Sequence, residues 1–303
     1  MSVKEIYLKT MKFSWLKLAM GAAITLISII LFLIFAGIGT LFRNGTVLLI
    51  MVLIWLSLSF GVYELVMYYV GYMIKAAHIA IIATAVTQGQ IPDNMVETGK
   101  EMVKERFAAS NVYFVLDRLI SGAVNQIQKA VGKIDNIFGQ IPGVSAIVNF
   151  LQIFIGIALG YVDECCLGYT FYNKDEEAFK CGCDGVVIYY QNAKHLLKNA
   201  AVTSLIVVVT TFVAWIIPFV VILGLFSVLD WSPIVAFFIA LMIALVIKVA
   251  FIDSYMLVKT MVSYMEVAPQ TEITEDLYEK LCNLSGKFRN LFNKSKNGYP
   301  VTY

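Results

Sequence analysis

The sequence predicts an all-α integral membrane protein. Hydrophobic residues make up 59% of the 303 residues and charged residues only 15%, whereas soluble domains are about 45–50% apolar and about 25% charged. The mean hydropathy is +0.78, and long stretches of the chain carry no charged residue at all. This composition excludes a soluble enzyme, a disordered chain and a small disulfide-stabilised scaffold.

Charge-free stretches locate the membrane segments, because a bilayer core about 30 Å thick needs about 20 apolar residues in a helix. Four such stretches lie at residues 18–42, 44–63, 199–229 and 231–247. The first is too long for the apolar part of a cleaved signal peptide. Turn-forming residues, Asn44-Gly45 and Ser232-Pro233, separate the members of each pair. We therefore expect two transmembrane helical hairpins with short connections.

A fifth charge-free stretch, residues 136–162, is diluted by Asn149, Gln152 and several glycines. Two alternatives stay open: segment 143–162 either crosses the membrane or enters it without crossing. Lys and Arg collect on the cytoplasmic side of membrane proteins, and the two hairpin turns contain one basic residue, Arg43. This favours a central embedded helix. We expect a multi-pass cell-membrane protein with both termini in the cytoplasm.

Two amphipathic stretches lie outside these spans. The apolar stripe of the first has helical spacing and consists of Ile120, Val124, Ile127, Val131, Ile134 and Phe138. The stripe of the second consists of Leu277, Leu281, Leu284, Phe288 and Leu291. Each helix either lies in the membrane interface or packs on the embedded helices. Packing is the commoner arrangement.

The chain therefore divides into five predicted regions. An N-terminal transmembrane hairpin (1–88) precedes a cytoplasmic or interfacial helical insert (89–140). An embedded helix and a short amphipathic helix over 184–198 together form region 141–198, which leads into a C-terminal transmembrane hairpin (199–267). A cytoplasmic amphipathic tail (268–303) ends the chain.

Ionisable side chains at membrane depth are costly, so each is a candidate for function. The candidates for a substrate or ion pathway are Glu64, Tyr68, Asp163, Glu164, Lys248 and Asp253. On a regular α-helix, Lys248 and Asp253 lie on different faces. The structural alternative is that the carboxylates pair with lysines or tyrosine hydroxyls, or mark the ends of spans. Small residues that predict close helix contact are Gly156, Gly160 and Gly168.

Cysteine and histidine patterns give no support for a metal, a cofactor or an enzyme. Zinc prefers Cys-x-x-Cys spacing, but the clustered cysteines are Cys165, Cys166, Cys181 and Cys183. The two histidines form no His-Glu-x-x-His motif, and no phosphate-binding glycine loop is present. The 23 basic and 21 acidic residues also give no basic surface for nucleic acid. We expect a non-enzymatic protein.

Two runs carry a resemblance to known proteins. Residues 161–169, YVDECCLGY, and residues 184–194, DGVVIYYQNAK, are similar to a pattern in uncharacterised bacterial multi-spanning membrane proteins. The arrangement of residues 97–266 also resembles the transmembrane region of choline transporter-like proteins, in which an insert and an embedded helix precede a Lys-flanked span and a final hairpin. Neither resemblance assigns a functional residue to this chain.

Two classes of function stay open. The first is a transporter or permease component that moves a small polar or cationic solute past the candidate carboxylates. The second is a non-catalytic membrane scaffold whose cytoplasmic helices bind the bilayer surface or a protein, either a second copy of the chain or another partner. Carboxylates at membrane depth favour transport, whereas carboxylates at the rim of the membrane favour the scaffold.

Overall fold

The computed structural model describes residues 1–107, 110–132, 160–228 and 233–297. These residues form helices and turns without a strand, which confirms the prediction of an all-α protein. The chain divides into two compact units. The membrane unit consists of residues 11–75 and 209–254, and the helical body consists of residues 1–10, 76–208 and 255–303.

In the part of the chain that the structure describes, four helices are long and apolar enough to cross a membrane. They are Met11–Leu41, Gly45–Gln88, Leu205–Leu225 and Ala236–Gln270. Each contains one of the four charge-free stretches predicted to span the bilayer, or most of it. Length and composition therefore identify a membrane protein. Segment 143–162, predicted to be an embedded helix, lies mostly outside the described residues.

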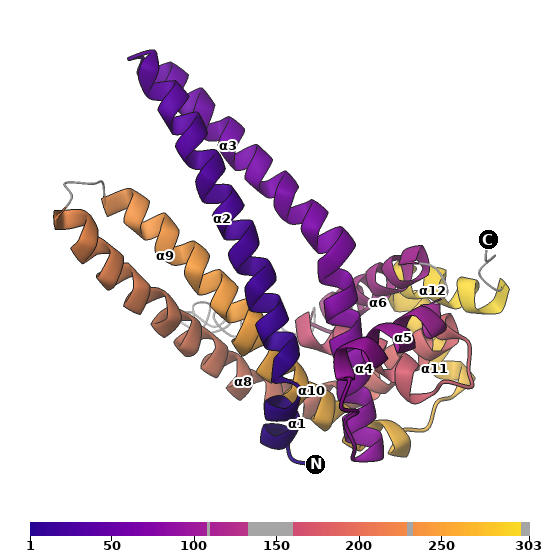
Figure 1. Ribbon diagram of the computed structural model, residues 1–303. Coiled ribbons are helices and arrows are strands. Elements are labelled where there is room, and N and C mark those ends of the chain that lie inside the picture. Colours follow the sequence, from indigo (N-terminus) through magenta and orange to yellow (C-terminus); the bar gives the residue numbers. More distant parts are fainter. Residues whose placement is uncertain (108–109, 133–159, 229–232, 298–303) are drawn as a thin grey trace, which may run out of the picture. The chain divides into compact units, whose positions relative to one another are not determined.

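The first two spans pack along each other within the membrane unit. α2 (Met11–Leu41) and α3 (Gly45–Val66) are joined at Arg43, whose φ of 47° lies in the left-handed region (Figure 1). The Asn44 side chain accepts a hydrogen bond from the Thr46 N–H at 2.9 Å and so caps α3. These local contacts explain why the chain reverses at this point.

A second pair of helices completes the membrane unit. α8 (Ala178–Val228) and α9 (Pro233–Ile247) contact each other through aromatic rings, with Trp215 and Phe237 centroids 5.4 Å apart. The short helix predicted over 184–198 is instead part of α8. The reason is local, because no glycine or proline follows Gly185 until residue 218.

A π-helical turn interrupts each of two spans. η1 (Met67–Gly71) joins α3 to α4 (Tyr72–Gln88), and η3 (Lys248–Ile252) joins α9 to α10 (Asp253–Val267). In each turn a backbone N–H donates to the carbonyl five residues earlier. A π turn contains more residues than an α turn. Side chains beyond it therefore rotate away from the faces that regular α-helical spacing predicts.

The core of the helical body combines the two amphipathic stretches. α6 (Ser110–Gly132) packs against α11 (Glu275–Leu284) and α12 (Gly286–Asn297). The stripe residues that are fully or almost fully buried are Ile120, Val124, Ile127, Leu281, Phe288 and Leu291. The prediction was that each stripe packs on the embedded helices, whereas the described parts of the two stripes share one core with each other. Ile134 and Phe138 lie outside the described residues.

The helical body also contains the remaining helices outside the membrane unit. They are α1 (Val3–Lys9), α4, α5 (Met95–Phe107), a helix over residues 160–172, the first part of α8, and α10. Gly89, at φ 70°, directly follows α4, a conformation that glycine adopts without a steric penalty. The described residues of the predicted insert (89–140) and of the predicted tail (268–303) belong to the same compact unit.

Candidate functional site

Lys248 and Asp253 form an ion pair in the membrane unit. The Lys248 Nζ donates to both carboxylate oxygens of Asp253, at 2.7 and 2.9 Å. The prediction that these side chains lie on different faces is wrong, because η3 adds a residue to the turn between them. The Asp253 N–H also donates to the Lys248 carbonyl. The pairing agrees with the structural alternative for this carboxylate.

The N-terminal end of α2 contacts the same region. The Lys17 Nζ donates to the Ser254 Oγ at 3.0 Å, and the Trp15 and Phe251 rings meet edge to face at 5.3 Å. Sequence analysis used Lys17 as the boundary of the first charge-free stretch and did not identify it as a site residue. No spacing rule links Lys17 to Ser254, because the two residues are far apart in the chain.

The carboxylate of Glu64 is exposed in the last turn of α3. Tyr68, in η1, is 53% exposed and packs edge to face against Tyr69 at 5.0 Å. Both candidates therefore belong to the membrane unit, where α3 passes into η1 inside the longer apolar helix Gly45–Gln88. Because both side chains are exposed, they lie on the surface of the membrane unit.

Asp163 and Glu164 belong to the helical body. They lie half-buried in the helix over residues 160–172, and the Asp163 Oδ1 accepts the N–H of Glu164 at 3.0 Å. The six candidates of the proposed pathway are therefore divided between the two units. Within the membrane unit, an ion pair joins the candidates Lys248 and Asp253.

Three predicted contact glycines have different surroundings. A Cβ added to Gly168 would collide with the sulfur and terminal methyl group of Met261 in α10, so side chains pack closely against this glycine. No atom of the described residues lies within 4 Å of the Cβ position of Gly160, and Gly156 lies outside the described residues. A close approach that sequence analysis missed occurs at Gly185, where an added Cβ would lie 2.8 Å from the Cys166 carbonyl oxygen.

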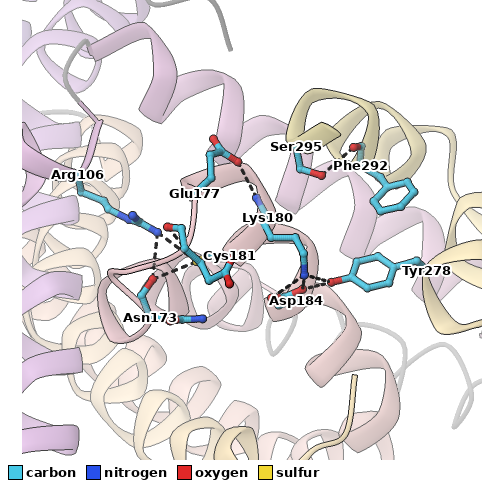
Figure 2. Close-up of polar contacts among 10 residues, drawn as sticks. Arg106, Asn173, Glu177, Lys180, Cys181, Asp184, Tyr278, Phe292 and Ser295 are labelled. Carbon is cyan, nitrogen blue, oxygen red and sulfur yellow. Dashed lines mark hydrogen bonds and ion pairs between the residues drawn. The ribbon is translucent and has the colours of Figure 1, made fainter. Parts of the chain in front are cut away.

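A buried polar cluster joins α8 to the C-terminal helices (Figure 2). The Lys180 Nζ donates to Asp184 Oδ1 at 3.0 Å and to the Tyr278 hydroxyl at 2.8 Å, and that hydroxyl donates to Asp184. Burial raises the pKa of the Asp184 carboxyl, although the hydrogen bond and positive charge of Lys180 act in the opposite direction. Burial alone would lower the pKa of Lys180, but its contacts with Asp184 outweigh this and raise it. The cluster therefore fastens the tail to α8.

A second polar cluster surrounds Cys181 (Figure 2). One Arg106 Nη donates to the Cys181 Sγ at 3.1 Å and to the Asn173 carbonyl at 3.2 Å. Burial raises the pKa of Cys181 to about 12, although the charge of Arg106 opposes the shift. The thiol is consequently neutral near pH 7 and is a poor nucleophile. This cluster has a structural role, joining α5 to α8.

The other thiols have similar surroundings. Cys165, Cys166 and Cys183 are fully buried, and burial raises the pKa of each. Across the described parts of the chain, no group of three or more His, Cys, Asp or Glu side chains is placed to hold a metal ion. Among the residues of the two polar clusters, the sequence could have indicated only the Lys180–Asp184 pair, because oppositely charged residues four apart are neighbours on a helix. No sequence pattern indicates that Tyr278 or Arg106 joins them.

A cavity of about 330 Å³ lies between three helices of the membrane unit. Its walls come from α2, from α3 with η1, and from α9 with η3. The lining residues are Lys17, Met20, Gly21, Ile24, Thr25, Ser28, Ser59, Tyr63, Met67, Met242, Leu245, Val246 and Val249. The lining is thus apolar with a few hydroxyl groups, and one cation lies among the described residues that form it.

Comparisons of the chain with protein-family models, with curated proteins and with solved structures found no match. The resemblances drawn from residues 161–169 and 184–194 therefore bring no functional residue to this chain.

Proposed function

We propose that the protein is a non-catalytic membrane scaffold. Its membrane unit crosses the bilayer four times as two helical hairpins, and the helical body lies on the cytoplasmic side together with both termini. There the body binds a partner protein or the bilayer surface. The observation that carries this proposal is the position of the ionisable side chains along the spans.

The lengths of the helices between each connection and the carboxylates indicate how deep the carboxylates lie. The apolar helix runs from Gly45 to Gln88, but its first 22 residues, α3, already rise about 33 Å at 1.5 Å per residue, which is close to the thickness of the hydrocarbon core. Glu64 lies in the last turn of α3. α9 and η3 have 15 and 5 residues, about 30 Å together, and Asp253 follows directly. With both connections at one face of the bilayer, both carboxylates reach the opposite rim.

Carboxylates at the rim support the scaffold over the transporter, because a solute pathway needs polar groups at the middle of the membrane. The pairing of Asp253 with Lys248 at 2.7 Å points the same way, since it leaves this carboxylate neutralised by its own helix. The well-packed helical body supports a binding role. Exposed basic residues of α12 offer a surface for an anionic partner: Lys287, Arg289 and Lys296.

The decisive experiment compares stability and flux in the same variants. For a scaffold, Asp253→Asn leaves the Lys248 ammonium without its carboxylate, so the protein loses about 1–3 kcal/mol of stability. The double variant with Lys248→Gln should recover most of this loss. Glu64→Gln is the control for removing an exposed carboxylate from the same unit. Solute or proton flux into liposomes should be equally absent in all of them.

A second candidate function, transport of a small polar or cationic solute, is favoured by one observation. π turns occur frequently at functional sites, and η3 contains Lys248 while Asp253 follows it. For a transporter, Asp253→Asn should fold normally while flux falls steeply. That result would overturn the scaffold proposal.

Sidedness is tested separately. A reporter fused after Tyr303, or before Met1, should register the cytoplasm. A C-terminal reporter on the outer side would overturn the four-span arrangement and would make segment 143–162 a true crossing.

A further inference from the structure

The cavity in the membrane unit has the dimensions of a ligand site. Its volume of about 330 Å³ falls in the range of about 300–1,000 Å³ that is usual for small-molecule pockets. α2 forms its long wall, from Lys17 to Ser28, a rise of about 16 Å. The cavity is therefore elongated along the span.

The two ends of this cavity differ in chemistry. At one end the Lys17 Nζ donates to the Ser254 Oγ at 3.0 Å, which fixes the ammonium group at the end of the cavity. At the other end, Ser28 Oγ donates to Ser59 Oγ at 2.8 Å, so these hydroxyls satisfy each other. Between the ends the lining is largely aliphatic and methionine. Methionine adapts its shape to irregular apolar ligands.

The α3 wall of the cavity is open to its surroundings. α3 contains no buried residue, and Phe60 beside the lining residue Ser59 is 63% exposed. In a bilayer, this helix is bathed in lipid chains. A lipid molecule can therefore enter the cavity sideways without leaving the membrane.

We propose that the cavity binds one anionic membrane phospholipid. An acyl chain lies between α2, α3 and α9, and the phosphate of its head group accepts hydrogen bonds from the Lys17 ammonium. The charge matches, because Lys17 contributes a cation where the head-group region of the bilayer meets the end of the span. This inference goes beyond the scaffold function and needs only that the membrane unit is inserted.

The experiment uses the full chain in nanodiscs of phosphatidylcholine with a minority of phosphatidylglycerol. Native mass spectrometry after mild detergent extraction counts the lipids that stay bound. We expect one phospholipid per chain, enriched in phosphatidylglycerol about fivefold over its share, which is the equivalent of about 1 kcal/mol for one lysine. Lys17→Gln should retain the lipid and lose the enrichment.

Matched controls separate the cavity from the general surface. Lys12→Gln removes an exposed charge from the same helix and should keep the enrichment. Ile24→Trp fills the cavity and should reduce occupancy at least fivefold, whereas Leu26→Trp, at a position 60% exposed, should not. If Ile24→Trp fails to fold, Lys17→Gln still decides, because it leaves the apolar lining unchanged.

Three results would overturn the proposal. One is equal retention of phosphatidylcholine and phosphatidylglycerol by the unaltered protein. Another is an equal effect of Lys12→Gln and Lys17→Gln, which would indicate charge at the surface in general. The third is a lipid-free dimer that Ile24→Trp dissociates, because a second copy of the chain would then cover the cavity.

Discussion

The helical body and the membrane unit are both built from apolar helices, yet they bury their side chains very differently. In the body, Ile81, Val187 and Phe288 are completely shielded from the surroundings. In the membrane unit, α3 has no buried residue, and Phe60 is 63% exposed. Hydrophobic burial therefore stabilises the body, whereas the apolar side chains of the membrane unit stay exposed on its surface, and such surface gives helices in a bilayer little reason to associate.

Polar contacts differ in the same way. In the body, Asp184 is only 5% exposed and belongs to a cluster of hydrogen-bonded side chains. This cluster joins Lys180 to Tyr278, which lie far apart in the sequence. In the membrane unit, hydrogen bonds join α2 to α3 at Ser28, whose hydroxyl donates to Ser59 and whose carbonyl accepts from the Trp55 indole N–H. We conclude that the body depends on specific packing and that the membrane unit depends mainly on the length and apolarity of its helices.

The largest expected effect compares two phenylalanines. Phe288→Ala removes a fully buried ring from the body and should cost about 3–5 kcal/mol of stability. Phe60→Ala removes an exposed ring from α3 and should change stability by less than about 0.5 kcal/mol. Thermal unfolding in detergent measures both. Similar losses would contradict the difference between the units.

Two glycines test the same difference through close packing. Gly185→Ala places a methyl group 2.8 Å from the Cys166 carbonyl oxygen and should destabilise the protein by about 1–3 kcal/mol. Gly61→Ala in α3 meets no atom within 4 Å and should stabilise the helix by about 0.5–1 kcal/mol. If both variants unfold like the parent, the close approach at Gly185 is not a structural requirement.

The buried thiol of Cys181 makes stability depend on pH. Burial raises its pKa from 9.0 to about 12, so between these values the unfolded chain releases a proton that the folded chain retains. Stability is therefore full below pH 9 and falls as pH rises, by up to about 1.4 kcal/mol per pH unit. Cys181→Ser should make the fall in melting temperature between pH 9 and 11 shallower. An unchanged profile would mean that the folded thiol ionises like an exposed one.

The smallest expected effects concern single hydrogen bonds. Ser28→Ala removes a bond between α2 and α3, and such bonds between membrane helices contribute about 0.6 kcal/mol on average. Tyr264→Phe in the body removes the hydroxyl that donates to the buried Gly185 carbonyl at 2.7 Å, while the Cys166 thiol still donates to this carbonyl at 3.3 Å. This variant should cost about 1 kcal/mol. Equal costs in chemical denaturation would show that hydrogen bonds contribute similarly in the two units.

Local features of the fold were predictable from the sequence. Apolar length located the four candidate spans, because the thickness of a bilayer sets a length that a single helix must satisfy by itself. Helical spacing likewise identified the stripes that include Ile120 and Phe288, and both residues are buried. The helical spacing of apolar residues shows that one face of a helix must be buried, but it does not show which other helix of the chain packs against that face.

The candidate site was harder to predict. Lys248 and Asp253 were both identified from their cost at membrane depth, yet their pairing was not, since regular spacing puts them on different faces. The π turn at η3 changes this geometry, and it has no signature in the residues themselves. Lys17 was recognised only as a boundary, because its place at the cavity depends on how α2, α3 and α9 pack.

The sequence by itself thus determined that this chain is helical, apolar enough for a membrane, and divided between long apolar spans and shorter amphipathic helices. Only the tertiary structure decided that the insert and the tail share one core, that Tyr278 reaches Asp184, and that three spans enclose a cavity ending at Lys17. The physical reason is the range of the interactions. Helix formation and membrane partition act on neighbouring residues, whereas packing joins residues that the chain keeps far apart.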